Sequence, residues 1–476
     1  MTLTLRQFLS ATSGSLISGT PDQPVGPVSI DSRTLRSGQT FIALQGPHFD
    51  GHDYLRTAAD RGASLLVIQT LDARADFRPM HIPDLIQVPD TLKALQQWGR
   101  FVRQQTPATV IGVTGSNGKT TTKEMLAAIL RRSGKTLATR GNLNNHIGLP
   151  LMLTELEPDH RFAVIEMGTS RKGDMAVLVE AALPRVGLIT NVGKDHLAFL
   201  GSPEGVLAEN RLLYDRLPAD GIRIVNLDDP LLKPLATQLP GRVITYGKDL
   251  NAQVRAEAVV PGTPLRLTLV LEGEPYPVTL QTSATIQVLN ALAAAATAHA
   301  LGIPPADILT GLASFKAAAM RLQVHEQPNG SLLVNDAYNA NPSSMRASIA
   351  SFCETYSDRK RWVVLGDMRE LGVLARQEHE ELGHWLALQP LERVWLYGRD
   401  TRFIESALRS AGTRMAVDRF RKKRYLIEAL QRSLEHERPA VLFKASRSMQ
   451  LEKVIEPLLS DSVKPSPPSV SVGGPS

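Results

Sequence analysis

The chain has 476 residues, of which 43% are hydrophobic and 21% are charged, and its formal net charge of +6 is spread along the sequence. This length predicts about three domains, and the composition excludes a largely disordered protein. Because basic and acidic residues are both distributed along most of the chain, a nucleic-acid-binding surface is poorly supported, and acidic small molecules such as phosphates are the better-matched ligands.

Cysteine content and apolar segments indicate a cytoplasmic protein. The one cysteine, Cys353, permits no internal disulfide and fits no metal-ligand spacing, so we interpret it as a small buried side chain. The start of the chain lacks the basic region and apolar core of a signal peptide. Residues 281–305 contain no Asp, Glu, Lys or Arg, but their polar residues and alanine-rich centre favour a close-packed helix ended by Gly302, without membrane insertion.

Strand and helix patterns alternate along most of the chain, which predicts an α/β fold. Residues 1–106 contain short apolar runs such as TFIALQG and ASLLVIQT, and are expected to form a small α/β domain. Residues 107–318 favour a parallel sheet wrapped by helices, followed by a mostly β stretch and the alanine-rich helix. Residues 319–459 form a third α/β region with the predicted strands SLLVNDAY, RWVVLGDM, RVWLYG and AVLFKAS. Residues 460–476, rich in serine, proline and glycine, predict a disordered tail.

The segment GVTGSNGKTTTKEML, residues 112–126, predicts a phosphate-binding loop between a strand and a helix. It departs from the Walker pattern by one residue, because Val113 occupies the position where that pattern has glycine. Backbone N–H groups of the turn and of the helix N-terminus suit phosphate oxygens. Lys119 adds a full positive charge, and the hydroxyl of Thr120 can reach a magnesium ion. These features predict a nucleotide site but specify no reaction.

Two further side chains suggest an ion site. Glu166 lies at the end of the apolar strand FAVIEMG, and a parallel sheet presents the residues at the carboxyl ends of its strands to a ligand. His196 is expected to close another strand in LITNVGKDHLAFLGS. For His196 alone, an ordinary hydrogen-bonded histidine remains the alternative. A regulatory GTPase is disfavoured, because Asn191 and Lys194 in TNVGKDH have the wrong spacing for a guanine-reading motif.

Seven segments resemble, in order, the Mur ligases of peptidoglycan synthesis: TGSNGKTTTKEM, GNLNNHIGLP, VIEMGTS, KDHLAFLGS, NDAYNANPSSM, LGDMRELG and KASRSM. The phosphate loop of these ligases lacks the early Walker glycine, which matches the departure at Val113. DAYNANPSSM followed by LGDMRELG is most similar to the family members that add D-alanyl-D-alanine to UDP-N-acetylmuramoyl-tripeptide. The resemblance implies a central P-loop ATPase domain between a UDP-substrate domain and a C-terminal Rossmann-like domain that binds the dipeptide.

The resemblance also implies a reaction. ATP phosphorylates the terminal carboxylate of the tripeptide, and the amine of D-alanyl-D-alanine attacks the acyl phosphate, so no protein nucleophile is needed. The resemblance implies that Lys119 contacts the β and γ phosphates of ATP and that Thr120 binds one magnesium ion. Glu166 and His196 are expected to bind a second magnesium ion.

Further residues are assigned by the same resemblance. The other expected ATP-binding residues are Gly115, Ser116, Asn117, Gly118, Thr121, Asn290 at the adenine, Arg321 from the linker and Asp336 at the ribose. Contacts to UDP are expected at Ser32, Arg33, Gly46, Asp50, Gly51 and His52. The dipeptide pocket is expected at Asn339 and Asn341, with Lys444, Ser446 and Arg447 nearby. Taken alone, Arg321 would be read as a solvated surface arginine.

The chain departs from the family pattern at two places. Most members have a lysine fourteen residues after the histidine, carbamylated to hold the second magnesium, where this chain has Asn210. Glu209 is adjacent, but one helical step turns a side chain by about 100°, so simple substitution is not favoured. In SATIQVLN, Gln287 could retain the amide chemistry of a family asparagine, whereas Ile286 cannot replace the usual histidine.

Three alternatives remain at this stage. The first is a D-alanyl-D-alanine-adding ligase, the second is another Mur-type ligase with a different amino acid, and the third is a nucleotide-binding homologue that has lost turnover along with the lysine. The third residue of the tripeptide is not specified by the sequence. A monomer is expected.

Overall fold

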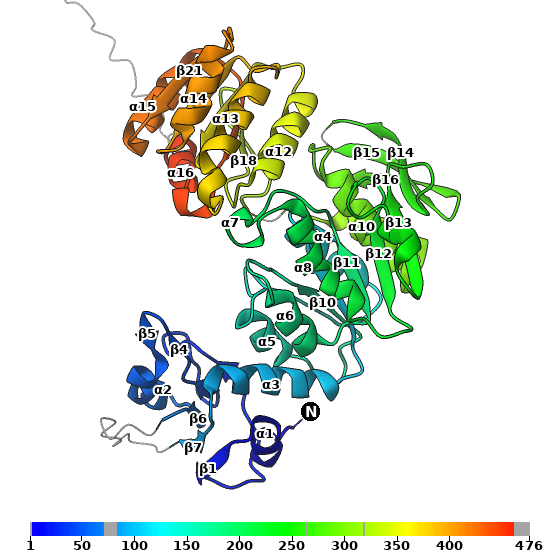
Figure 1. The fold of residues 1–476 in the computed structure, drawn as a ribbon, viewed down its shortest axis with the longest axis vertical. Helices are drawn as coiled ribbons and strands as arrows, with labels where there is room; N and C mark the ends of the chain where they lie inside the picture. The colour runs from blue at the N-terminus through cyan, green and yellow to red at the C-terminus, as the bar shows by residue number, and fades with distance from the viewer. Residues whose placement is uncertain (1, 71–82, 263, 318, 461–476) are drawn as a thin grey trace, which may run out of the picture.

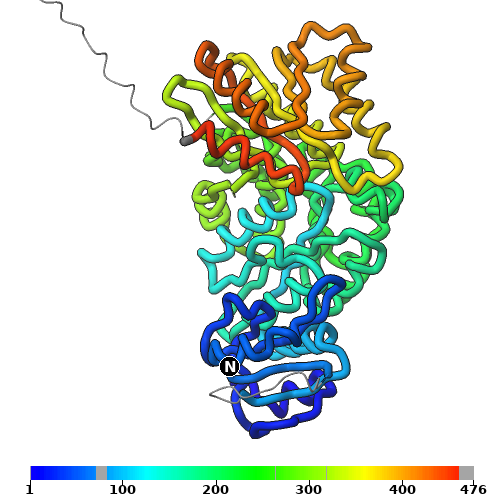
Figure 2. The backbone as a smooth tube through the Cα atoms, turned by 90° about the vertical axis from the view of Figure 1, so that its left-hand side faces the viewer, coloured from blue at the N-terminus to red at the C-terminus, as the bar shows by residue number. Residues whose placement is uncertain are grey.

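The computed structural model describes residues 2–70, 83–262, 264–317 and 319–460. Its three main sheets follow one another along the chain. In both Figure 1 and Figure 2 the N-terminal sheet lies at one end of the long axis, the C-terminal sheet at the other, and the largest sheet between them. The predicted three-domain α/β fold is thus confirmed.

The N-terminal sheet has the order β1-β7-β6-β3-β2, with β1 antiparallel to β7 and the other pairs parallel. A separate two-stranded ribbon, β4 with β5, precedes the short helix η1. The strands are β1 (Ser15–Ser18), β2 (Val28–Ser29), β3 (Thr40–Ile42), β4 (Gln45–Gly46), β5 (Phe49–Asp50), β6 (Leu65–Ile68) and β7 (Asp84–Gln87). The helices are α1 (Leu5–Thr12), η1 (Gly51–Tyr54), α2 (Leu55–Asp60) and α3 (Thr91–Gln104).

Helix α3 joins the N-terminal sheet to the central one. Its buried face includes Trp98 and Gly99, and one continuous apolar cluster extends from Leu3 to Leu213. At Gly99 a Cβ atom would lie 2.6 Å from the carbonyl oxygen of Pro150 in α5 (Gly148–Leu153), so glycine lets the two helices touch backbone to backbone. The two regions therefore share a core where α3 meets α5.

The central sheet has the order β16-β15-β14-β13-β12-β11-β8-β10-β9 and is parallel from β14 to β9. Strands β15 and β16 extend it in antiparallel fashion. The strands are β8 (Thr109–Thr114), β9 (Thr136–Ala138), β10 (Phe162–Glu166), β11 (Val186–Ile189), β12 (Ile222–Asn226), β13 (Arg242–Gly247), β14 (Val254–Val260), β15 (Leu265–Leu271) and β16 (Glu274–Leu280). Besides α5, its helices are α4 (Lys119–Leu130), α6 (Asp174–Ala182), α7 (Leu197–Leu200), α8 (Pro203–Asp215), α9 (Leu235–Gln238), α10 (Gln287–Ala300) and α11 (Pro305–Ser314).

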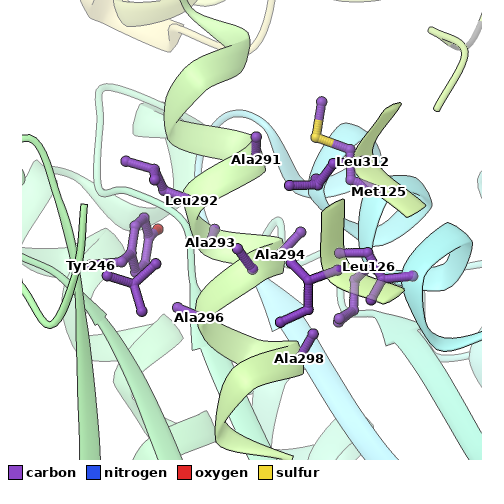
Figure 3. Packing of buried hydrophobic residues seen from close by; sticks show 14 of the residues in the cluster. Met125, Leu126, Tyr246, Ala291, Leu292, Ala293, Ala294, Ala296, Ala298 and Leu312 are labelled. Carbon is purple, nitrogen blue, oxygen red and sulfur yellow. The ribbon is translucent and has the colours of Figure 1, made fainter. Parts of the chain in front are cut away.

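Helix α10 is the predicted alanine-rich helix, and it is buried in the core of the central domain. Figure 3 shows its alanines facing Met125 and Leu126 of α4, Leu312 of α11 and Tyr246 of β13. Small side chains let α10 approach α4 closely, which brings the start of α10 beside the predicted phosphate loop. The helix is followed by Gly302 at φ 73°, as the sequence indicates. Over the described residues, every helix is too short or too polar to cross a bilayer.

The C-terminal sheet has the order β17-β18-β22-β19-β20-β21, with only β17 antiparallel. The strands are β17 (Gln323–Glu326), β18 (Leu332–Asn335), β19 (Arg361–Gly366), β20 (Arg393–Tyr397), β21 (Ala416–Phe420) and β22 (Ala440–Lys444). The helices are α12 (Pro342–Thr355), η2 (Gly372–Leu374), α13 (Ala375–Leu386), α14 (Thr401–Ser410), α15 (Lys423–His436), η3 (Arg447–Met449) and α16 (Glu452–Ser460).

Two compositional predictions fall in this region. Cys353 is buried in α12, and burial raises the pKa of its thiol to about 11, consistent with a packing role. The predicted disordered tail lies outside the described residues except for Ser460, which is the last residue of α16.

Replacing Gly99 by alanine is expected to destabilise the junction between α3 and α5. Alanine gains up to about 1 kcal/mol of helix propensity over glycine. The clash with the Pro150 carbonyl costs about 1 to 3 kcal/mol and outweighs that gain. Urea denaturation of Gly99→Ala should therefore show a lower midpoint than wild type, whereas Gln97→Ala on the exposed face should not. An unchanged midpoint for Gly99→Ala would contradict this packing.

Candidate active site

The turn after β8 has the backbone of a phosphate-binding loop. Gly115 and Gly118 adopt φ values of 126° and 81°, which other residues rarely reach. A Cβ atom on Gly115 would lie 2.3 Å from the hydroxyl oxygen of Thr190, and one on Gly118 would lie 2.2 Å from Oδ1 of Asn290. Gly118 is also the N-cap of α4, so the first N–H groups of that helix meet no capping side chain. This end of α4 suits an anion.

Two cations lie at this loop. The ammonium of Lys119 donates to the carbonyl oxygens of Gly115 at 2.5 Å and Ser116 at 3.4 Å. The guanidinium of Arg321 donates to the hydroxyl of Thr120 at 2.9 Å and stacks 4.1 Å from the ring centroid of Tyr338. The predicted linker arginine is therefore placed at the phosphate loop.

The backbone beside Arg321 turns sharply. Both its neighbours, Met320 and Leu322, are in the left-handed region, with φ values of 59° and 55°. Such strain is costly in non-glycine residues and is concentrated at functional segments.

Asn290 and Gln287 lie together at the start of α10. The Asn290 Oδ1 accepts a hydrogen bond from the Thr122 hydroxyl at 3.2 Å, and its Nδ2 donates to Gln287 Oε1 at 2.8 Å. Gln287 thus orients the asparagine that the sequence assigns to adenine, while Ile286 immediately precedes the helix.

The predicted dipeptide and ribose residues have other partners in this structure. Asn341 is the N-cap of α12, and its Nδ2 donates to Asn117 Oδ1 at 3.1 Å, so it ties the C-terminal domain to the phosphate loop. Asn339 is exposed. The carboxylate of Asp336 accepts from Lys444 Nζ at 2.6 Å and from the Ser348 hydroxyl at 2.8 Å.

The basic turn after β22 is held locally. The Ser446 hydroxyl accepts from the backbone N–H of Arg369, and Arg447 pairs with Glu452. These contacts hold the turn against the loop after β19 and the start of α16, and the dipeptide pocket stays a prediction.

Glu166 is a buried carboxylate at the end of β10, only 3% exposed. Its Oε1 accepts from Asn144 Nδ2 at 2.8 Å, whereas its Oε2 is buried and has no hydrogen-bond partner among the described residues. A buried oxygen without a partner is unfavourable, and a bound cation would compensate it.

The prediction that His196 closes a strand is wrong. β11 ends at Ile189, because the next residues leave the sheet to hold the phosphate loop: Asn191 accepts from the N–H of Ser116 with its carbonyl and from that of Asn117 with its side chain. His196 instead precedes α7 with a left-handed φ of 50°.

The imidazole of His196 lies between two carboxylates. Its Nδ1 is 2.6 Å from Oε2 of Glu370, close enough for an ion pair although the alignment is poor for a hydrogen bond, and its Nε2 is 3.6 Å from Oδ2 of Asp195. Burial lowers the pKa of His196, but Glu370 and Asp195 outweigh burial and the net pKa is raised. The pairing with His196 in turn lowers the pKa of Glu370.

These donors fit magnesium. The chain offers a hydroxyl at Thr120, carboxylates at Glu166 and Asp195, and an imidazole at His196, and oxygen-rich sets of this kind suit a hard divalent cation. The His196 Nε2 and the Asp195 oxygen lie 3.6 Å apart, wider than the roughly 3 Å between neighbouring ligands of an ion with 2.0–2.1 Å bonds, so they would have to approach each other to share one ion.

Asn210 and Glu209 have structural partners. The Asn210 Oδ1 accepts from the hydroxyls of Thr114 at 3.2 Å and Thr169 at 3.3 Å. The Glu209 carboxylate accepts from the N–H groups of Gly173 at 2.9 Å and Met175 at 2.7 Å, at the start of α6. Both oxygens of Glu209 are thus engaged at the start of α6, and the expectation that Glu209 does not simply replace the family lysine stays a prediction.

The six residues expected at UDP lie on two segments of the N-terminal region. Ser32 is buried, and Arg33 pairs with Asp31 at 2.8 Å. Gly46 is in β4, and Gly51 lies against the backbone of Leu44. Asp50 lies 2.6 Å from Nδ1 of His52, and Nε2 of His52 accepts from the N–H of Gln69, so this pair also supports the local fold.

Sequence reasoning missed three residues at the site. Asn144, Asp195 and Glu370 lie in GNLNNHIGLP, KDHLAFLGS and LGDMRELG, so the motifs themselves were found. Spacing along the chain could not show that Asn144 contacts Glu166, or that Glu370 contacts His196 from the C-terminal domain.

Comparisons with known proteins define the class. Family profiles match residues 25–102 (Mur ligase family, catalytic domain), 113–298 (Mur ligase middle domain) and 320–447 (Mur ligase, glutamate ligase domain). The chain belongs to the Mur ligase family.

Particular relatives are similar over nearly the full length. The UDP-N-acetylmuramoyl-tripeptide–D-alanyl-D-alanine ligases of Bacillus subtilis and Escherichia coli are each 34% identical, covering 96% of this chain and 98% of their own. The structure of MurF from Acinetobacter baumannii superposes with a TM-score of 0.87 at 30% identity, covering 97% of this chain and 99% of its own. The structure of MurF ligase from Thermotoga maritima, solved in complex with ADP, superposes with a TM-score of 0.79 at 27% identity. The match covers 92% of this chain and 98% of its own.

Glu209→Gln tests the division of roles between Glu209 and the ion site. The amide offers one acceptor oxygen in place of two and loses the charge at the start of α6, so stability should fall by about 1.5 to 3 kcal/mol. Thermal unfolding would measure the loss, with Glu180→Gln on the exposed face of α6 as control. Weakened Mn²⁺ binding with unchanged stability would show instead that Glu209 is a metal ligand.

Proposed function

We propose that this protein joins D-alanyl-D-alanine to UDP-N-acetylmuramoyl-tripeptide in an ATP-dependent, ADP-forming reaction of peptidoglycan precursor synthesis. One observation carries the proposal beyond sequence similarity: the phosphate loop contacts the C-terminal domain and its linker directly. Asn341 donates a hydrogen bond to Asn117, and Arg321 donates one to Thr120. A phosphoryl group at this loop would lie beside the C-terminal domain, to which we assign the dipeptide amine.

In the proposed first step, an oxygen of the tripeptide carboxylate attacks the γ phosphorus of ATP, the bond to the bridging oxygen breaks, and ADP leaves. The dipeptide amine then attacks the acyl carbon, loses a proton, and expels phosphate as the amide forms. Lys119 and the N-terminus of α4 would hold the phosphates, and Arg321 would neutralise charge from the linker.

Magnesium fits this proposal as a cofactor. When bound, it supplies positive charge to the phosphates and to the acceptor carboxylate. Thr120 would hold one ion. Glu166 and His196 would hold the second, with Asn144 orienting the Glu166 carboxylate.

The wider assignments belong to the same proposal. We place the domain boundaries near residues 106 and 318, the UDP moiety at the N-terminal domain, and the dipeptide at the C-terminal domain. The protein would work in the cytoplasm as a monomer. Asn210 favours one second candidate, a homologue that binds nucleotide without turnover, because an amide cannot supply the carboxylate of a carbamylated lysine.

A substrate-omission assay tests the proposed function. Phosphate release should require ATP, UDP-N-acetylmuramoyl-tripeptide and D-alanyl-D-alanine together. Lys119→Ala should lower kcat/KM by about 100-fold or more, because it removes a charge that stabilises the transferring phosphoryl group, while circular dichroism stays unchanged. Equal phosphate release with either acceptor or dipeptide omitted would refute the proposal, and ATP binding without turnover would support the second candidate.

A further inference from the structure

The segment LGDMRELG of the C-terminal domain contacts the His196 segment of the central domain. The carboxylate of Glu370 lies 2.6 Å from His196 Nδ1, and the backbone carbonyl of Glu370 accepts from the N–H of Ala198 at 3.2 Å. At Gly372 a Cβ atom would lie 3.2 Å from the Ala198 side chain, so the two segments touch closely.

Both members of the pair have strained backbones. His196 and Glu370 adopt left-handed φ values of 50° and 63°, an arrangement that L-residues rarely adopt. Strain of this kind persists where the surrounding structure enforces it, and it is concentrated at functional sites.

Docking alone does not account for Glu370. Other contacts near Glu370 already join the two domains. The ammonium of Lys194 pairs with Glu378 at 2.6 Å and with Glu381 at 3.1 Å, and the side chain of Asn341 donates a hydrogen bond to Asn117. The Glu370 side chain is 57% exposed, so solvent screens its charge and limits what the charge contributes to association. Its contact partner His196, by contrast, is only 18% exposed.

The chemistry of the contact orients the imidazole. A carboxylate at Nδ1 favours the tautomer with its proton on that nitrogen and leaves the Nε2 lone pair free for a metal ion. Nε2 is also the nitrogen that faces the Asp195 carboxylate. The ring is therefore held with its ligating atom toward the Asp195 carboxylate.

The geometry points to Glu370 as a positioning residue: from the C-terminal domain it holds His196 in the orientation that binds the second divalent cation. The cation site is then complete only when the C-terminal domain is docked. This inference rests on the proposed function for its ion but adds a residue from another domain. It also gives one way in which the site can retain affinity although Asn210 lacks a carboxylate.

Mn²⁺ binding measured by electron paramagnetic resonance tests the inference without turnover. The full-length protein is titrated with Mn²⁺ in the presence of a non-hydrolysable ATP analogue. The wild-type protein should bind two Mn²⁺ ions. Glu370→Ala should lower the affinity for the second ion by on the order of tenfold or more and leave the affinity for the first ion unchanged. Glu370→Gln keeps an oxygen beside Nδ1 but loses the negative charge, so its affinity should fall between those of the wild type and Glu370→Ala.

Glu381→Ala is the matched control, because it removes a docking contact to Lys194 without touching His196. It should leave Mn²⁺ affinity at the wild-type value. Unchanged affinity in Glu370→Ala, an equal loss in Glu381→Ala, or a single ion in wild type would each overturn the inference. Failure of the ligation assay with two ions still bound would refute the proposed reaction but not the role of Glu370.

Discussion

The structure of the site depends on how the turn from Gly115 to Gly118 is held. Asn191 binds two successive N–H groups of this turn with its carbonyl and its side chain, and Thr190 donates to the Asn117 carbonyl at 2.6 Å. Both residues directly follow β11, the strand adjacent to β8. The chain thus leaves the sheet at Ile189 in order to hold the phosphate loop, and in doing so it carries Lys194, Asp195 and His196 toward the C-terminal domain.

The loop is supported from two other sides. Behind it, the alanine-rich α10 packs against α4 and places Asn290 so close to Gly118 that only glycine fits there. In front of it, Asn341 at the start of α12 contacts Asn117, and Arg321 contacts Thr120. One short segment is therefore in contact with both the central core and the neighbouring domain, so that domain docking acts on the same segment at which we propose that the phosphates bind.

Much of the fold followed from local patterns. The buried strands β8, β10, β19 and β22 were predicted because apolar runs alternate with amphipathic helices, and the alanine-rich helix was found from its composition and Gly302. β12, β13, β17 and β21 were not identified. Their sequences contain charged or polar residues, as in RVITYG and AVDRF, and β17 and β21 lie at sheet edges where one side meets solvent.

The candidate site was partly predictable. Lys119 and Thr120 begin a helix and Glu166 ends a strand, so the pattern along the chain is enough to place them. Glu370 and Asn144 act through contacts that form only after folding, and His196 was misplaced because an apolar run was extended past Ile189. Local periodicity cannot show where a strand ends when the following residues are needed by a neighbouring loop.

The central claim is that the tripeptide carboxylate receives the γ-phosphoryl group before the amide forms. The most direct measurement uses UDP-N-acetylmuramoyl-tripeptide labelled with ¹⁸O in its terminal carboxylate, followed by mass spectrometry of the released phosphate. An acyl-phosphate route predicts that one labelled oxygen moves from the carboxylate to phosphate in each turnover. Phosphate without the label, formed together with the amide, would contradict the account.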